Sequence, residues 1–304
     1  MKTSGFLLFR LNFVDRQNLF ENPIRTDSDF QRVIETAASE DFDVVKQGPR
    51  SGFRWALREI TTDFAGGEDE PYIFGFFSYE VTSRRGPIIT PRGIAQGTSM
   101  VSPPSATLVR VVIHLKRHIL AIEDIPSIIK PGGGWKTSLQ TILDTAAWNL
   151  GFTSLIHLDP LIPTEIVETR IKQFDRITRL RVTLRIPNPD LGPSFRRLYE
   201  EMKEGGIREL TEDMRNERGL TLTSETLPQA ALDMAMKGYR KGKIHVYGVR
   251  NGQRDEFTVA DDVARIEVEE LRDFIEGYAA GNRSTAVRRF AQSLIQRIDD
   301  SVSK

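Results

Sequence analysis

The sequence predicts an α+β fold of two subdomains, each of mostly antiparallel sheet with flanking helices, and a helical C-terminus. The first observation is Arg176–Asp190, where apolar and basic residues alternate with the two-residue period of a strand. The second is Asn251-Gly252, a hairpin turn signal between two alternating segments. The third is the order of elements, because helices and strands mix without the strict alternation of a parallel sheet.

Residues 1–158 form the predicted N-terminal subdomain, which is rich in strands. Residues 72–79 are densely aromatic, which is typical of a central buried strand. Proline and glycine are frequent in Arg84–Pro104, which predicts a loop. Further strands are expected over residues 6–14, 53–60, 107–115 and 118–122, the last two as a hairpin, and helices over 30–38 and 135–150.

Residues 159–304 form the predicted C-terminal subdomain. Pro163 suits the first position of a helix, Ser224 suits a helix cap, and Gly205-Gly206 suits a helix end. Helices are expected over residues 164–174, 194–203, 224–236, 269–280 and 285–302. Strands are expected over residues 177–186, 207–214, 242–249, 253–259 and 264–268.

Composition limits the possible functions. Lys and Arg together number 42, as do Asp and Glu, so nucleic-acid binding requires local segregation of charge. The absence of cysteine excludes disulfides, thiolate metal sites and cysteine nucleophiles. The apolar run Gly5–Phe9 is interrupted by Arg10, which predicts a first strand and not a signal peptide. No run approaches the roughly 18 apolar residues of a membrane span, so we expect a cytoplasmic protein without a membrane partner.

The basic side of the strand at residues 177–186 is the main candidate for a binding surface. Arg179, Arg181 and Arg185 alternate with the apolar residues and would project side by side. Arginine suits phosphate because its planar guanidinium can donate two hydrogen bonds at once. The alternative is a solvent-exposed face whose arginines pair with carboxylates of a neighbouring strand, for which Glu209, Glu212 and Asp213 are available.

A second basic cluster follows the helix at residues 224–236. It consists of Lys237, Arg240, Lys241 and Lys243, interleaved with aromatic Tyr239, His245 and Tyr247. Basic and aromatic residues in alternation are typical of surfaces that bind single strands. The alternative is a helix C-terminus whose cations offset the helix dipole.

Signals for catalysis and metal binding are weak. Asp190, Glu201 and Lys203 have the order of a Mg²⁺-dependent nuclease motif, but a helix would separate Glu201 and Lys203 by about 200° around its axis. Gly132–Thr137 differs from a phosphate-binding loop because Trp135 precedes the lysine. The four histidines are scattered, and no G-x-S-x-G motif occurs. We therefore predict no catalytic residue, metal or cofactor.

The run Leu180–Asp190 resembles an uncharacterised bacterial family found among phage-defence genes, in which a basic strand also precedes an Asn-Pro-Asp turn. The strand–turn–strand segment Gly242–Asp261 is similar as well, and the order of elements resembles that of RexA-type phage-exclusion proteins. The resemblance covers mainly the C-terminal half. It implies an α+β DNA-binding dimer with a helical C-terminus and a role in bacterial immunity.

Together these observations predict a non-catalytic, nucleic-acid-binding component of an anti-phage defence system, acting as a homo-oligomer or as a subunit of a larger complex on DNA or RNA. One alternative is a Mg²⁺-dependent nuclease that uses Asp190, Glu201, Asp255 and Asp261. Another is a protein-interaction subunit that binds its partner through the apolar face of the C-terminal helix, formed by Val287, Phe290, Ala291, Leu294 and Ile298.

Overall fold

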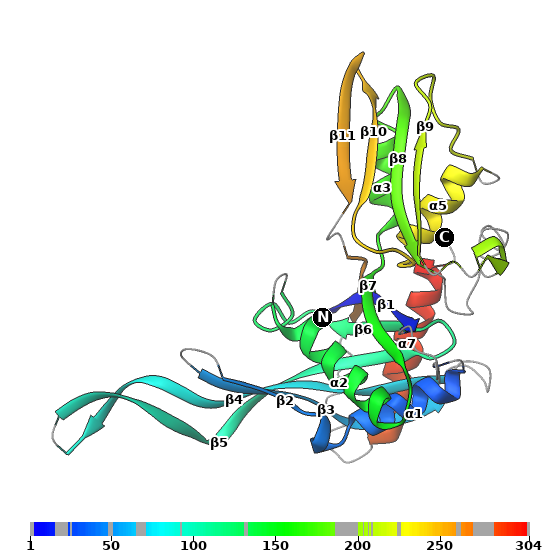
Figure 1. The fold of residues 1–304 in the computed structure, drawn as a ribbon. Coiled ribbons are helices and arrows are strands. Elements are labelled where there is room, and N and C mark those ends of the chain that lie inside the picture. The colour runs from blue at the N-terminus through cyan, green and yellow to red at the C-terminus, as the bar shows by residue number, and fades with distance from the viewer. Residues whose placement is uncertain are drawn as a thin grey trace.

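The computed structural model describes residues 3–15, 24, 26–47, 51–64, 71–91, 93–130, 133–185, 200–202, 204–205, 207, 209–223, 226–259, 263–269 and 283–302. Within these residues the fold is α+β, and every strand pairing is antiparallel, as the sequence predicts. The strands form two sheets, and helices cover both faces of one of them and one face of the other (Figure 1).

The large sheet contains eight of the described strands, in the order β12-β1-β6-β5-β4-β3-β2, with β7 paired to the far part of β1. These strands are β1 (Thr3–Asp15), β2 (Val44–Gln47), β3 (Ser51–Phe64), β4 (Pro71–Thr90), β5 (Gly93–His114), β6 (Ile119–Glu123), β7 (Ser154–Pro160) and β12 (Arg265–Glu269). The hairpin predicted near Lys116-Arg117 is the β5–β6 connection.

Both faces of the large sheet are buried at its centre. Helices α1 (Asp27–Ala37) and α2 (Trp135–Asn149) share one hydrophobic core with one face, and α7 (Arg283–Val302) shares a second core with the other. This explains the aromatic run of β4, in which Ile73 and Phe77 enter the first core while Phe74 and Phe76 enter the second.

The small sheet has the order β11-β10-β8-β9. Its strands are β8 (Arg176–Arg185), β9 (Glu209–Arg215), β10 (Ile244–Arg250) and β11 (Gln253–Val259). Helices α3 (Thr164–Ile171) and α5 (Leu227–Met236) contribute to the hydrophobic core of this sheet. The β10–β11 hairpin turns at Asn251 and Gly252, both with positive φ, as the Asn-Gly signal predicts.

The end of the chain returns to the large sheet. β12 pairs with β1, and α7 packs on the same sheet through Val287, Phe290 and Leu294. The predicted cut between residues 158 and 159 falls within β7, and the segment that forms the small sheet and its helices lies between β7 and β12. The small sheet is therefore an insertion between two parts of the larger body.

The predicted loop at Arg84–Pro104 is instead a β-ribbon, which is a correction. β4 and β5 continue as a paired hairpin from Ser83↔Met100 to Thr90↔Gly93, and the ribbon extends far from the body (Figure 1). Ser51↔Arg84 is the last β3–β4 pair. Beyond Arg84 the ribbon therefore contains only the two strands β4 and β5 among the described residues. In such a ribbon alternate N–H groups face no partner strand, so proline is tolerated.

Other predicted elements differ at their ends or lie beyond the described residues. Thr26 caps α1 through a capping box with Asp29, and α1 begins at Asp27, three residues before the predicted start at residue 30. α3 begins after Pro163, and α5 begins after Thr226. Ser224, most of the helix predicted over residues 194–203 and almost all of the helix predicted over 269–280 lie outside the described residues.

Candidate nucleic-acid interface

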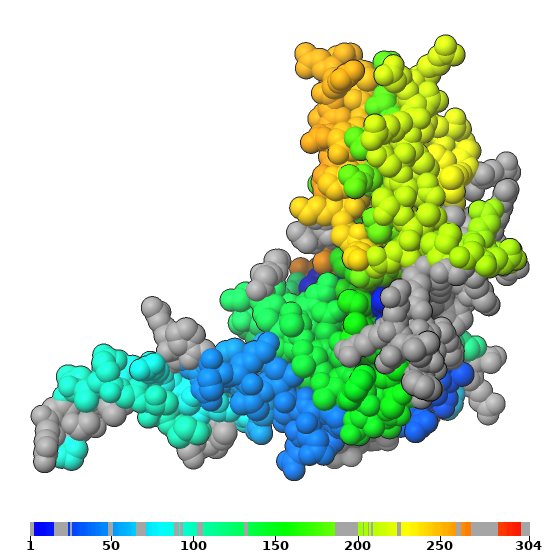
Figure 2. Space-filling view, in the orientation of Figure 1, coloured from blue at the N-terminus to red at the C-terminus, as the bar shows by residue number. Residues whose placement is uncertain are grey.

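The small sheet has one covered face and one open face. On β8, Leu180, Val182 and Leu184 are buried with α3 and α5, so the alternate residues lie on the opposite side. We call this opposite side the open face, and no described helix covers it (Figure 2). It consists of Arg179, Arg181 and Thr183 on β8, Thr211, Asp213 and Arg215 on β9, Lys243, His245 and Tyr247 on and before β10, and Arg254, Glu256 and Thr258 on β11.

Aromatic and basic side chains are neighbours at the centre of the open face. The register places Tyr247 opposite Arg179 and His245 opposite Arg181. The Arg179 guanidinium lies 5.0 Å from the centroid of the Tyr247 ring, and the His245 and Tyr247 rings are nearly parallel with their centroids 6.5 Å apart. The result is a row of two flat rings along β10, with cations beside it on β8.

Arg179 is held by a carboxylate. Its Nε and Nη2 donate to the two oxygens of Asp213 at 2.7 and 2.8 Å, and Arg215 Nη2 also donates to Asp213 at 2.8 Å. Hydrogen bonds from Arg179 and then Arg215 hold the pKa of Asp213 well below its usual range. Arg179 therefore agrees with the alternative interpretation of the sequence, in which arginines of this strand pair with carboxylates of a neighbouring strand.

Arg181, Lys243 and Arg254 are the cations of the open face that remain available. All three side chains are exposed, and none forms an ion pair or hydrogen bond within the part of the chain that the structure describes. On the same face, Thr183 and Thr211 are hydrogen-bonded across β8 and β9 at 3.0 Å. The described open face thus offers three unpaired cations, Arg181, Lys243 and Arg254, together with two aromatic rings.

Arg185 does not belong to the exposed surface, although the alternation predicts it there. It lies at the end of β8 that meets the large sheet, is 8% exposed, and donates through Nη1 to Asp159 on β7 at 2.8 Å. Glu209 is also near, 3.5 Å from its Nε. The correction is that Arg185 connects the two sheets. Strand alternation predicts which face of a sheet a side chain lies on, but it does not predict whether another part of the protein covers that face.

The second basic cluster is dispersed. Arg240 is 3% exposed and donates to the carbonyl of Gly242, so it is a buried residue and not a surface cation. Lys241 pairs with Glu209 at 2.8 Å. Lys237 follows the end of α5 and accepts a hydrogen bond from Arg10 through its carbonyl. Of the four predicted lysines and arginines in this cluster, Lys243 alone is on the open face.

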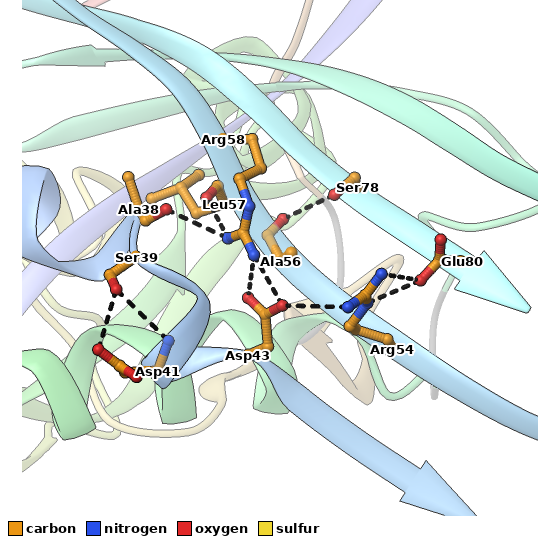
Figure 3. Close-up of polar contacts among 10 residues, drawn as sticks. All are labelled: Ala38, Ser39, Asp41, Asp43, Arg54, Ala56, Leu57, Arg58, Ser78 and Glu80. Atoms are coloured by element: carbon orange, nitrogen blue, oxygen red, sulfur yellow. Dashed lines mark hydrogen bonds and ion pairs between the residues drawn. The ribbon is translucent and has the colours of Figure 1, made fainter. Parts of the chain in front are cut away.

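A separate arginine cluster lies along strands β3 and β4 of the large sheet, beside the start of β2, and is structural (Figure 3). Asp43 is nearly buried and accepts two hydrogen bonds from Arg58 Nη2, both at 2.7 Å. Arg54 lies between Asp43 and Glu80 and is paired with both. The two arginines share one side of β3, and their charges are satisfied within the protein.

The residues of the nuclease alternative do not come together in the described part of the chain. Asp190, Lys203 and Asp261 lie outside it, Glu201 is exposed on a helical turn, and Asp255 pairs with Arg250 at 3.6 Å. Among the described residues no group of three or more carboxylate or histidine side chains could hold a metal ion.

The apolar face of the C-terminal helix is not available to a partner. Val287, Phe290, Ala291, Leu294 and Ile298 are all buried in the core that α7 forms with the large sheet. Phe290 contacts Phe6 and Phe74, with ring centroids 5.5 and 6.2 Å apart. This corrects the interaction surface expected for the alternative of a protein-interaction subunit.

Sequence reasoning missed the polar contacts that join the two sheets. Arg10 is buried, donates to the carbonyls of Lys237 and Arg117 at 2.9 and 2.5 Å, and lies 4.4 Å from the centroid of the Tyr239 ring. Asn12 donates to Asp159 and to the carbonyl of Gly238, both at 2.8 Å. The available signal was a charged residue inside the apolar run of β1.

Comparison with known proteins identifies the family. Residues 104–280, more than half of the chain, match the domain described as "Domain of unknown function (DUF4747)". The chain belongs to this family. The DUF4747 match includes the last part of β5 and continues through the small sheet to β12, so it contains the open face. None of the curated proteins compared with the chain matches it. In the described part of the chain, no helix is both long and apolar enough to cross a membrane.

Proposed function

We propose that this chain is a non-catalytic nucleic-acid-binding protein and that the open face of the small sheet binds the nucleic acid. One observation carries the proposal: a sheet backed by helices on one side presents His245 and Tyr247 beside Arg181 and Lys243 on the other. Aromatic rings on an open sheet can stack on unpaired bases, while neighbouring cations contact phosphates. This combination favours a single-stranded ligand.

The electrostatics of the face set the expected strength of binding. Asp213 and Glu256 lie on the same face as the cations, and Arg179 already pairs with Asp213. Few phosphates are therefore neutralised, and the salt dependence should correspond to about three contacts, one for each unpaired cation. Stacking of bases on Tyr247 and His245 should supply much of the remaining binding free energy, at roughly 1 to 3 kcal/mol per base.

We further propose that this binding serves bacterial anti-phage defence, with the protein acting as a homo-oligomer or as a subunit of a larger complex in the cytoplasm. The support is the resemblance of Leu180–Asp190 and Gly242–Asp261 to proteins of phage defence and phage exclusion. Survival of cells that carry the intact gene or a Tyr247→Ala variant, after phage challenge, tests the proposed role. Equal protection by both would contradict the link between defence and the open face.

The binding experiment compares three variants of the full chain. Tyr247→Ala removes a stacking ring, Arg181→Glu reverses an unpaired cation, and Arg32→Glu makes the same charge reversal at an exposed position on α1. Fluorescence anisotropy with single-stranded DNA and RNA should show about tenfold weaker binding for the first two and little change for the third. If neither Tyr247→Ala nor Arg181→Glu weakens binding, the open face is not the interface.

A further inference from the structure

The distal ribbon, residues 83–100, has a composition unlike the rest of the chain. No acidic residue occurs between residues 81 and 122, whereas Arg84 and Arg85 lie in the ribbon. The Arg84 and Arg85 side chains are exposed, and so are two apolar side chains, Ile94 at 80% and Met100 at 74%. An exposed surface with only positive charge indicates a polyanionic partner.

The two faces of the ribbon are different. Cross-strand pairs share a face, and the register places Arg85 with Thr98 and Ser83 with Met100. Ile94 lies on this same face, so Arg85 is located between the apolar side chains of Met100 and Ile94 along it. The other face contains Arg84 and Ser99 at its base and Gly86, Gly97 and Ala95 further along, where the small residues leave the backbone open to close approach.

The edges of the ribbon are poor templates for another strand. Pro87 and Pro91 cannot donate a backbone hydrogen bond, and Arg84 and Arg85 place charge beside the edge. Addition of a strand from a second copy of this chain is therefore disfavoured. The partner should instead contact the faces and the tip of the ribbon.

The dimensions of the ribbon suit a groove of duplex DNA. Six cross-strand pairs lie beyond the last β3–β4 pair, from Arg85↔Thr98 to Thr90↔Gly93, and give a two-stranded length of roughly 17 Å at about 3.3 Å per residue. The major groove of B-form DNA, about 12 Å wide, admits a two-stranded ribbon. Side chains cannot read the deep, narrow major groove of duplex RNA. Residues 82–104 contain no aromatic residue, so they cannot form stacking platforms for single strands.

We propose that this ribbon inserts into the major groove of a DNA duplex, with Arg84 and Arg85 contacting the phosphates and Ile94 contacting the base edges. An apolar side chain in the major groove can contact the methyl group of thymine. The inference rests on the proposed nucleic-acid function, and it adds duplex DNA to the ligands because the ribbon is separate from the open face (Figure 1).

The experiment uses the full chain and matched probes: a blunt DNA duplex, a DNA single strand of equal length and an RNA duplex. Arg84→Glu combined with Arg85→Glu should weaken binding to the DNA duplex by about tenfold or more and leave single-strand binding within about twofold. Ile94→Ser should weaken duplex binding by a smaller factor of about threefold. Arg32→Glu combined with Arg218→Glu is the matched control, because both positions are exposed and distant from the ribbon in sequence.

Unchanged binding of the DNA duplex by the double ribbon variant would overturn the inference, as would an equal loss on all three probes. Light scattering without nucleic acid compares the molar mass of the ribbon variants with that of the wild type. A lower mass for the variants would also overturn the inference, since the ribbon would then join copies of the chain. The two proposals fail separately: loss of single-strand binding in Tyr247→Ala tests the open face, and selective loss of duplex binding in the ribbon variants tests the ribbon.

Discussion

Arg185 donates a hydrogen bond to Asp159 at 2.8 Å, and this ion pair connects the last residue of the basic strand to β7 of the large sheet. The same oxygen of Asp159 accepts from Asn12 at 2.8 Å. Both partners of the ion pair have little exposed side chain. Arginines on one side of β8 therefore have two roles: Arg181 is exposed on the open face, whereas Arg185 joins the small sheet to the large one.

Loss of this ion pair should destabilise the protein. Arg185→Ala leaves the Asp159 carboxylate in a poorly solvated place with one donor fewer, so the free energy of unfolding should fall by about 2 to 3 kcal/mol. Arg181→Ala, on the same strand, should change it by less than about 0.5 kcal/mol. Urea denaturation measures both. A combined Arg185→Ala and Asp159→Ala variant should lose less than the sum of the two single changes, and strict additivity would contradict direct coupling.

Gly238 should not tolerate a side chain. Its φ is +85°, and a Cβ atom there would lie 2.7 Å from Cβ of Arg10, which is buried. Gly238→Ala should cost about 2 to 4 kcal/mol in the free energy of unfolding, from backbone strain and the clash together. Gly242→Ala is the matched control, because φ there is +78° but the space is open, and about 1 to 2 kcal/mol is expected. Equal losses at the two positions would show that the Arg10 contact is unimportant.

The sequence predicted correctly those features that depend on residues close together in the chain, such as turns and the buried sides of helices and strands. The Asn251-Gly252 turn has the positive φ values that these two residues accept readily, and the apolar stripe of α2, including Leu139, Ile142 and Ala146, is buried as its spacing indicates. The apolar side of β8 was predicted for the same reason, since a two-residue period determines which side chains share a face.

The rest depends on contacts between distant residues. The return of β12 to β1 joins Val268 to Ser4, and nothing near either residue specifies that pairing. The ribbon was predicted as a loop because proline and glycine frequencies do not distinguish a two-stranded hairpin from a turn. Arg185 was predicted at the surface because alternation cannot show that the large sheet covers this end of the strand. Arg240 was predicted there because an interleaving of basic and aromatic residues in the sequence does not show which of them are buried.

Neutralising Asp213 should strengthen nucleic-acid binding. Its carboxylate holds Arg179 and Arg215, and it is charged at every practical pH because those hydrogen bonds lower its pKa. Asp213→Asn releases both guanidinium groups and removes a negative charge from the open face. Single-strand affinity should rise severalfold, and the salt dependence should steepen by about one phosphate contact. Glu217→Gln, an exposed position in the turn after β9, is the control and should leave both quantities unchanged.

Truncation of Phe290 tests whether α7 covers its own sheet. Its ring packs on Phe6 and Phe74, and the Arg110 guanidinium lies 5.1 Å from its centroid. Phe290→Ala should lower the free energy of unfolding by about 3 to 5 kcal/mol through loss of burial and formation of a cavity. Val45→Ala, at an exposed position, should change it by less than about 0.5 kcal/mol. A loss that varies with protein concentration would instead indicate that α7 contacts a second chain.

His157 should make stability depend on pH. Burial, followed by the nearby Arg185 guanidinium, lowers the pKa of His157, and Asp159 offsets part of that effect. The unfolded chain therefore takes up this proton first, at a pH near the usual histidine value of about 6.5. The neutral histidine makes its full contribution to the free energy of unfolding above about pH 6.5. This contribution declines as the pH falls from there toward the pKa of His157 in the folded state. His157→Gln should lose less stability than the wild type between pH 7.5 and 5.5, and His245→Gln is the control for removing a histidine. An NMR titration that gives His157 a pKa at or above 6.5 would contradict the prediction.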